Sequence, residues 1–195
     1  EISDKELVVV TTDRLSAFDV ILPTPVPEKG IVLNKLSSFW FNLTKDIVPN
    51  HMISEDLKDM PAEFQKPEFE GRTILVKKLK MLPYEFIIRG YVFGSMWKAY
   101  KAGEPFCGHK IEGDYKLAQK LEKPILTPST KSSEGHDVNI SIEEMKTDVG
   151  EALAEQIEDV CLKLFDRCCT YAGEKGIIIA DTKLEFGLDE NGSLV

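Results

Sequence analysis

Acidic and basic residues alternate near the end of the segment Ile177–Gly187, which reads IIIADTKLEFG. In a β-strand, Asp181, Lys183 and Glu185 would point to the same side. Two carboxylates suit a hard cation such as Mg²⁺, and a lysine between them suits a phosphate or a carboxylate. A solvent-facing ladder of charges explains the alternation slightly better by itself, because charged side chains usually face water. The three consecutive isoleucines before it predict a central strand covered on both faces, which favours a polar cleft.

The segment Arg89–Ser95 (RGYVFGS) is a candidate anion site. Arg89 ends an apolar stretch with strand character, and Gly94 and Ser95 stand where a helix is expected to begin. Free backbone N–H groups at that helix end, the Ser95 hydroxyl and the guanidinium predict a pocket for an anion. Gly-Ser is also a common turn with an N-cap, which remains the simpler interpretation of these two residues taken alone.

Polar residues follow the end of a probable strand in the segment Thr11–Asp19 (TTDRLSAFD). Asp13, Ser16 and Asp19 are candidate site residues there, because site residues often lie just beyond strand ends. A turn capped by Asp13 or Ser16 explains the same letters without any function. Both interpretations stay open.

The polar segment Thr127–Asp137 (TPSTKSSEGHD) is long enough to act as a lid over a site. A solvated loop is its default interpretation. Lys131, His136 and Asp137 are the residues that suggest more than a solvated loop.

Periodicity and turn residues predict the elements that must position these candidates. The expected strands are Leu7–Thr12, Thr73–Leu79, Glu85–Phe93 and one that begins at Ile177. The expected helices are Asn34–Val48, whose apolar residues recur at helical spacing and would face a core, and Met96–Ala102, which would stop at Gly103. A third, long helical stretch opens with a capping box at Ser141 and Glu144, and Gly150 could divide it. The segment Cys107–Lys131 is rich in Gly, Pro and Lys and has no clear period, so no regular element is expected there. Helices interspersed among strands without strict alternation predict an α+β fold, and the Lys80–Tyr84 link is a candidate hinge between lobes 1–80 and 81–195.

Composition narrows the classes of function. The net charge of −9 argues against a nucleic-acid partner, and the apolar runs are too short to span a bilayer. The four cysteines form no CxxC pair and no usual zinc spacing with histidine, which predicts reduced, buried thiols in a cytoplasmic protein. Neither end reads as a natural terminus, so more protein is expected on both sides. From the residues alone, the expected site is an anion-binding, metal-assisted cleft between two lobes.

The chain resembles the phosphoribosylaminoimidazole-succinocarboxamide synthase (SAICAR synthetase) family from about Leu7 to its end. The segments that carry the resemblance are VVVTTDRLSAFDVILPTPVPEKGIVLNKLSSFWF, KKLKMLPYEFIIRGYVFGS, ILTPSTKSSEGHDVNIS and IIIADTKLEFG. Four ordered matches of this length are far more specific than a short motif, and PVPEKG makes the chain resemble the longer, fungal-like form. The resemblance implies a two-lobed α+β fold whose N-terminal antiparallel-sheet lobe is similar to those of kinases and ATP-grasp enzymes, with an ATP cleft between the lobes.

The same resemblance implies an activity. The family uses MgATP to couple L-aspartate to the carboxylate of carboxyaminoimidazole ribonucleotide, which gives SAICAR, ADP and phosphate. It implies small-molecule partners, no nucleic acid, no membrane, and a monomer or small homo-oligomer. The rival interpretations are a small-molecule kinase on a similar scaffold and a non-enzymatic binding or scaffolding module.

The resemblance further implies roles for the candidate residues. Glu185 would help to hold Mg²⁺, Lys183 would contact the carboxylate of the ribonucleotide, and Asp181 would line the same site. The binding residues it implies are Arg89 and Ser95 for the ribonucleotide phosphate, the backbone at Lys80, Met81 and Leu82 for adenine, Lys131 and Asp137 for aspartate, and Asp13, Ser16 and Asp19 for positioning of substrate or loop. The family also has a glycine-rich hairpin with a phosphate-contacting lysine before the first strand here, and an acidic segment with a second metal ligand and a substrate-binding arginine beyond Val195. Without these two segments the chain is expected to be inactive; the alternative is that the protein has them as disordered or removed residues.

Overall fold

The chain forms two compact units in the computed structural model, which describes residues 1–18, 20–131 and 137–195. Unit 1 comprises Glu1–Lys80 together with Gly187–Val195, and unit 2 comprises Met81–Phe186. The strand β6 (Lys80–Met81) contains the boundary between them. The description below takes each unit by itself.

The segment Gly187–Val195 belongs to unit 1, whereas the sequence placed the whole of 81–195 in one lobe. Its two end residues exchange backbone hydrogen bonds of 3.0 and 2.9 Å, which closes the segment into a loop that begins with β11 (Gly187–Leu188). Lys5 and Glu190 form an ion pair of 2.8 Å within the same unit. These local contacts attach the segment to the N-terminal part of the chain.

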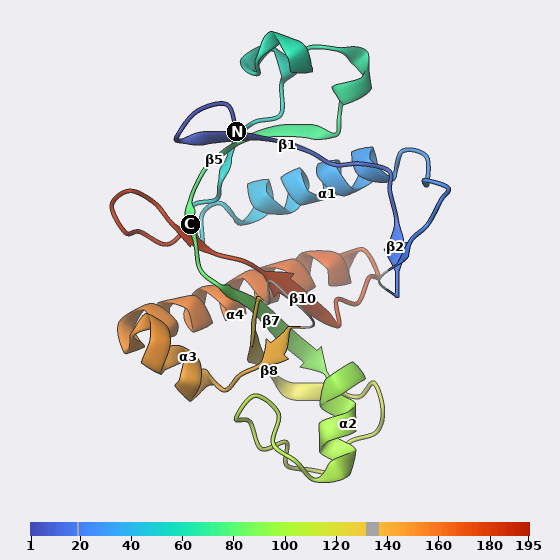
Figure 1. Ribbon diagram of the computed structural model, residues 1–195. Coiled ribbons are helices and arrows are strands. Elements are labelled where there is room, and N and C mark those ends of the chain that lie inside the picture. Colours follow the sequence, from blue (N-terminus) through green and yellow to red (C-terminus); the bar gives the residue numbers. More distant parts are fainter. Residues whose placement is uncertain (19, 132–136) are drawn as a thin grey trace. The chain divides into compact units, whose positions relative to one another are not determined.

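The sheet of unit 1 is antiparallel and has the order β1 (Glu6–Val10), β5 (Thr73–Lys77), β4 (Met52–Ser54). The central strand β5 reads TILVK, and its first four residues are buried, as a central strand of β-branched and aliphatic residues should be. Figure 1 shows this sheet beside helix α1 (Lys29–Thr44). The remaining elements of the unit are the short hairpin strands β2 (Ser16–Ala17) and β3 (Val20–Ile21) and the 3₁₀ helices Leu57–Asp59, Ala62–Phe64 and Pro67–Phe69.

Helix α1 packs through small and polar residues, which corrects the expectation that its apolar residues face a core. Its buried residues are Gly30, Asn34, Ser38 and Thr44, whereas Leu36 is exposed. A Cβ atom at Gly30 would collide with the carbonyl oxygen of Thr11, so only glycine allows the helix start to approach this closely. The close approach therefore requires glycine at this point of the packed face, while Leu36 lies outside that face.

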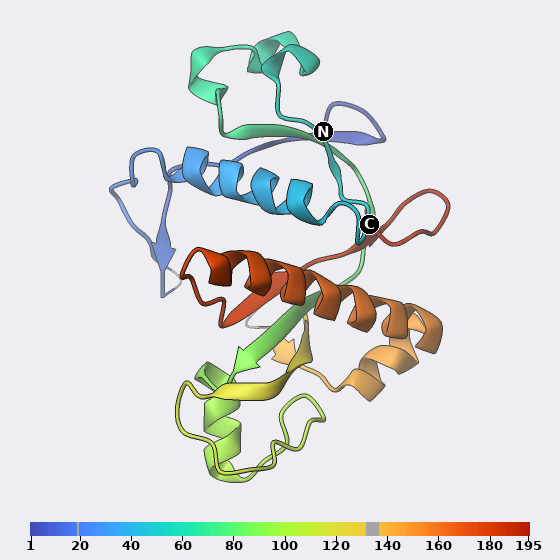
Figure 2. The ribbon, with the colours of Figure 1, turned by 180° about the vertical axis from the view of Figure 1, so that it is seen from behind.

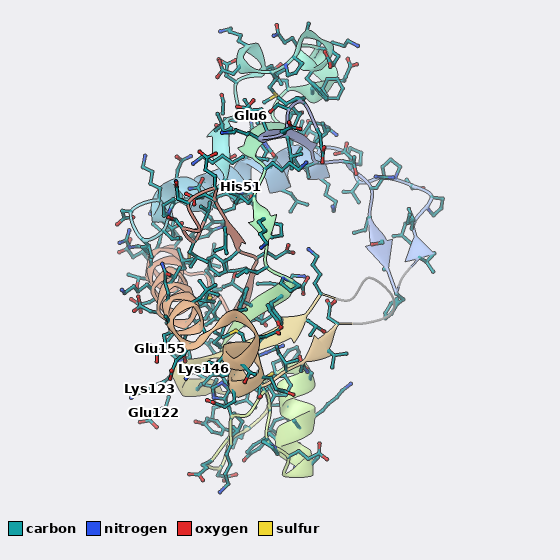
Figure 3. The ribbon with its side chains drawn as sticks, turned by 60° about the vertical axis from the view of Figure 1, so that its left-hand side comes forward. Glu6, His51, Glu122, Lys123, Lys146 and Glu155 are labelled. Carbon is teal, nitrogen blue, oxygen red and sulfur yellow. The ribbon has the colours of Figure 1, made fainter. Side chains whose placement is uncertain are left out.

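His51 is the half-buried imidazole of unit 1, and its position is labelled in Figure 3. Its ring meets that of Phe41 edge to face, with centroids 4.9 Å apart. Burial lowers the pKa of His51 from its usual 6.5, because the apolar surroundings disfavour the charged imidazolium. The neutral form of this side chain therefore belongs to the folded state.

Unit 2 is built on an antiparallel sheet with the order β10 (Asp181–Leu184), β7 (Tyr84–Tyr91), β8 (Lys120–Thr130), β9 (Val138–Asn139). Helices α3 (Ile142–Val149) and α4 (Glu151–Glu174) contact strands of this sheet, and Figure 2 shows α4 lying across them. The predicted capping box is confirmed, because the Ser141 hydroxyl accepts from the Glu144 amide at 3.1 Å and the Glu144 carboxylate accepts from the Ser141 amide at 2.7 Å. Gly150, with φ of 90°, divides the two helices as expected.

The helix-covered face of the sheet carries the core of unit 2. Its fully buried side chains are Phe86, Ile88, Leu126, Met145, Ile157 and Cys161. Gly90 of β7 lies against α4, where an added Cβ atom would sit 3.1 Å from Phe165 Cζ. A second apolar cluster surrounds helix α2 (Gly94–Ala102), which ends at Gly103 in the left-handed region as expected.

Two expectations for unit 2 were wrong. Ile177–Ile179 is not part of a central strand: β10 begins at Asp181, it is the edge strand, and Ile178 is 72% exposed. Strand β8, the longest strand described, lies in Cys107–Lys131, where no regular element was expected. It also includes the start of the predicted lid Thr127–Asp137. Pro124 and Pro128 lie within β8, and such prolines hide strand periodicity because proline is usually absent from strand interiors.

All four cysteines are free thiols. Cys107 and Cys161 are buried as predicted, while Cys168 and Cys169 are only partly buried. Burial raises the pKa of Cys107 to about 11, so this thiol is a poor nucleophile. Among the described helices, none has the length and apolar character needed to cross a membrane.

Candidate functional site

The face of the unit 2 sheet opposite the helices is polar, and we call it the polar face. Side chains alternate along a strand, and cross-strand partners share a face. The register pairs Asp181 with Arg89 and Glu85 with Ser129. The same register also places Ile87 and Ile125 on this face. Its candidate site residues in or directly after the strands are Glu85 and Arg89 of β7, Thr127, Ser129 and Lys131 of β8 and its end, and Asp181, Lys183 and Glu185 of β10 and its end. The structure therefore places the alternating charged residues of the sequence on the same sheet face as Arg89.

Two ion pairs cross the polar face. Lys183 Nζ lies 2.7 Å from Glu85 Oε1, and Lys131 Nζ lies 2.6 Å from Glu185 Oε2. In the first pair the Glu85 side chain is only 10% exposed, whereas in the second pair both side chains are at least 35% exposed. The hydrogen bond to Glu185 raises the pKa of Lys131, because it stabilises the charged ammonium. Both lysines carry N–H groups beyond those used in the pairs and can bind an added anion.

Arg89 is held in place by neutral neighbours. Its Nε donates to Thr127 Oγ1 at 3.1 Å, and that hydroxyl donates to the Ile87 carbonyl at 2.8 Å. The guanidinium lies 5.3 Å from the centroid of the Phe106 ring, within the range of a cation–π contact. Among the residues that the structure describes, no carboxylate forms a salt bridge with Arg89. The cation is therefore oriented without being neutralised, which suits recognition of an anion.

Ser95 lies in the first turn of α2, which begins shortly after the end of β7. The turn has no side-chain cap, and both Gly94 and Ser95 are exposed. Gly94 has φ of 61°, a conformation that glycine adopts readily. The helix end thus offers its N-terminal amides to solvent, as an anion site requires.

Asp13 forms two backbone hydrogen bonds and an ion pair within unit 1. It accepts from the Gly30 amide at 2.8 Å and from the Glu28 amide at 3.3 Å, and it pairs with Arg72 at 3.1 Å. These bonds lower the pKa of Asp13, with the bond from Gly30 as the main cause. The contacts attach the loop after β1 to the start of α1. A role in substrate positioning stays a prediction.

Ser16 lies in the exposed strand β2, paired in register with Ile21. Asp19 lies outside the described residues. The roles predicted for these two residues stay predictions.

The predicted adenine hinge, Lys80–Leu82, contains the boundary between the two units. The amide of Leu82 donates to the Phe186 carbonyl at 2.9 Å, and Met81 is exposed. The amide of Leu82 is therefore engaged within unit 2, and the role of this backbone in binding adenine stays a prediction.

The predicted aspartate loop begins at Lys131 and ends at Asp137, and residues 132–136, which include His136, lie outside the described residues. The Lys131 amide donates to the Pro83 carbonyl at 3.0 Å, which extends the pairing of β7 and β8 by one step. Asp137 directly precedes β9. Lys131 thus has a fixed backbone and a side chain directed to Glu185.

Sequence reasoning missed four residues of this site: Glu85, Phe106, Thr127 and Ser129. Glu85 is a charged residue within an apolar strand, a signal that could have been noticed, because unpaired charges are rarely buried. Thr127 and Ser129 were assigned to a loop, and Phe106 reaches Arg89 only through the tertiary fold. The Ser129 hydroxyl is buried without a hydrogen-bond partner in the described structure.

In the described part of the chain, no three His, Cys, Asp or Glu side chains gather closely enough to hold a metal ion. As a metal ligand, Glu185 would contribute a single carboxylate. Magnesium commonly takes one or two protein carboxylates and completes its shell with phosphate oxygens and water. The donor set here fits an ion that arrives with a nucleotide.

Comparisons with known proteins agree on one family. A family model described as SAICAR synthetase matches residues 1–195. The chain is 52% identical to a phosphoribosylaminoimidazole-succinocarboxamide synthase of Lachnospira eligens and 47% identical to one of Chromobacterium violaceum, over 98% and 100% of its length. It spans 68% and 69% of those two proteins.

Solved structures give the same result. A SAICAR synthase from Saccharomyces cerevisiae complexed with SAICAR aligns over the whole chain with a TM-score of 0.90 and 41% identity, and 67% of that chain is covered. A SAICAR synthetase in complex with ADP aligns over the whole chain with a TM-score of 0.79 and 28% identity, and 73% of it is covered.

Proposed function

The chain belongs to the SAICAR synthetase family, and we propose that its polar face binds and activates the ribonucleotide and receives the aspartate. The family uses ATP to join L-aspartate to the carboxylate of carboxyaminoimidazole ribonucleotide in de novo purine biosynthesis. The observation that carries the proposal is the gathering of Arg89, Lys183 and Lys131 on one sheet face, with two of the three cations held by carboxylates.

Each cation suits one anion of the reaction. Arg89 is oriented by Thr127 and presents a planar fork, which suits the ribonucleotide phosphate, and the exposed start of α2 with Ser95 supplies further donors. Lys183 suits the carboxylate that ATP activates, and Asp181 lines the same site. Lys131 suits a carboxylate of aspartate, and Asp137 belongs to the same loop.

In this reaction the protein mainly positions the reactants, rather than forming bonds with them itself. Phosphoryl transfer from ATP makes the carboxylate an acyl phosphate, and the aspartate amine then displaces phosphate. Fixed cations next to the carboxylate stabilise the charge that develops in both steps, and holding the amine in place removes much of the entropic barrier. We assign the backbone of Lys80, Met81 and Leu82 to the adenine, and Asp13, Ser16 and Asp19 to substrate or loop positioning.

We assign Mg²⁺ to Glu185. A single half-exposed carboxylate that now pairs with Lys131 can exchange this partner for an ion bound to nucleotide phosphates. When bound, the ion would neutralise phosphate charge. Lys131 carries N–H groups beyond the one directed to Glu185, and these can bind a carboxylate of aspartate.

The test is ADP release by the purified enzyme with each substrate omitted in turn. Ligation requires aspartate and the ribonucleotide together, whereas a small-molecule kinase would release ADP without aspartate and a binding module would release none. Lys183→Ala and Glu185→Ala should abolish turnover and leave the fold intact. Lys163→Ala, which removes an exposed ion pair with Asp159 on α4, is the matched control and should turn over normally. Normal turnover in the first two variants would refute the site.

We place the enzyme in the cytoplasm, where small phosphorylated substrates and ATP are found and where thiols such as Cys107 and Cys161 stay reduced. A monomer or a small homo-oligomer fits a site in which three strands of one unit supply the cations. The mass in solution, measured by light scattering, tests the latter statement.

A further inference from the structure

Glu85 is the only charged residue that is buried in the part of the chain that the structure describes. A buried carboxylate is unfavourable unless a cation and hydrogen-bond donors compensate for its lost hydration. Its observed partner is Lys183, at 2.7 Å. A hydrophobic residue at this position of β7 would fill the space without that requirement, so the acid is present for another reason.

The geometry fixes the carboxylate and leaves the ammonium accessible. Glu85 sits in β7, an interior strand of the sheet, and β10 lies beside it, with Lys183 in register with Ile87. Lys183 is therefore the diagonal neighbour of Glu85 on the polar face, two positions along the strand. The Lys183 side chain is 52% exposed, while that of Glu85 is 10% exposed. One N–H of the ammonium points to the acid, and its other two can reach a ligand.

Ser129 is the cross-strand partner of Glu85 on β8 and is 2% exposed, and its hydroxyl has no hydrogen-bond partner in the described structure. Buried hydroxyl groups usually have a partner, but this one forms no bond to the Glu85 carboxylate. Lys183 therefore remains the observed partner of Glu85.

We propose that Glu85 is a positioning residue for the ligation, which acts through Lys183 on the carboxylate of the ribonucleotide. This inference rests on the proposed function of Lys183. Glu85 holds the flexible lysine side chain at the polar face, so the ammonium is already in place when the carboxylate arrives. The exposed pair Lys131–Glu185 differs, because both of its partners can exchange with solvent and substrate.

The probe that isolates this role is a pair of ribonucleotides. Carboxyaminoimidazole ribonucleotide carries the carboxylate, and aminoimidazole ribonucleotide lacks it. Glu85→Gln keeps the size of the side chain and removes its charge. We expect binding of the carboxylated ligand and kcat for ligation each to fall by about tenfold to hundredfold, the scale on which misplaced catalytic groups act, while binding of the other ligand and the KM for ATP stay unchanged.

A double-mutant cycle separates positioning from a general structural role. If Glu85 acts through Lys183, then Glu85→Gln should cause little further loss of affinity for the carboxylated ligand in a Lys183→Met background. Asp159→Asn on α4 removes the charge of another acid paired at 2.6 Å and should change neither ligand's affinity. Additive losses in the cycle, or equal losses for both ribonucleotides, would overturn the proposal.

Glu85→Asp provides the same test if the Gln variant does not fold. It retains the charge on a side chain one methylene shorter, so it should discriminate between the two ribonucleotides less well than the wild type. Discrimination equal to that of the wild type in whichever variant folds would overturn the positioning role. Failure of the proposed function is distinguishable, since the wild-type enzyme would then form no SAICAR from its three substrates.

Discussion

Thr127→Val should weaken binding of the ribonucleotide phosphate without changing the binding of the other substrates. Valine has nearly the same shape as threonine, so the change removes the hydroxyl that accepts from Arg89 Nε at 3.1 Å and donates to the Ile87 carbonyl at 2.8 Å. A hydrogen bond to a charged group contributes about 1.5–3 kcal/mol. Arg89 keeps its contact with Phe106, so we expect about 1–2 kcal/mol of lost binding, or roughly a 5- to 30-fold higher KM for the ribonucleotide.

The assay is steady-state ligation with each substrate varied in turn, together with thermal unfolding. Because the phosphate is remote from the reacting carboxylate, its binding energy should be the same in the ground state and the transition state, so kcat should change little. Thr127→Ser keeps the hydroxyl and is the matched control, with a KM near that of the wild type. An unchanged ribonucleotide KM in Thr127→Val, or an equal rise in all three KM values, would refute the account of how Arg89 is held.

The remaining predictions concern stability and are measured by thermal or denaturant unfolding. Gly90→Ala should destabilise the protein by about 1–3 kcal/mol, because its Cβ atom would press on Phe165, and an unchanged midpoint would contradict this packing. Gly173→Ala, in helix α4 with no atom near its added Cβ, should stabilise it by about 0.5–1 kcal/mol, and any loss would be contrary evidence. Stability linked to the neutral His51 is fully present above its unfolded pKa of 6.5 and is lost as pH falls below 6.5 and through the lower folded-state pKa. His51→Phe should therefore lose less stability than the wild type between about pH 7.5 and pH 5.5, and parallel curves would argue against a buried imidazole.

Local signals in the sequence predicted several elements well. The capping box of α3 and the division at Gly150 depend on a few adjacent residues, and the structure confirms both. The alternation after Ala180 placed Asp181 and Lys183 on one side of a strand, and the register of β10 agrees. Such features are readable because each is decided by neighbours in the chain.

The errors share a physical cause, which is that burial depends on partners far away in sequence. The three isoleucines predicted a central strand, yet they precede an edge strand, because apolar character does not say which surface an element meets. Helix α1 buries Gly30 and Ser38, and at Gly30 the closeness of Thr11 leaves room only for glycine. Strand β8 escaped detection because two prolines interrupt its pattern.

The sequence by itself determined the family, the fold class and the charged residues of β10, since these follow from ordered motifs and local alternation. The tertiary structure decided which of these residues act together. Antiparallel pairing brings Glu85 to Lys183 and Thr127 to Arg89 across separations of 98 and 38 residues. Register between strands is set by the whole buried face of the sheet, so no local pattern could have assigned these partners.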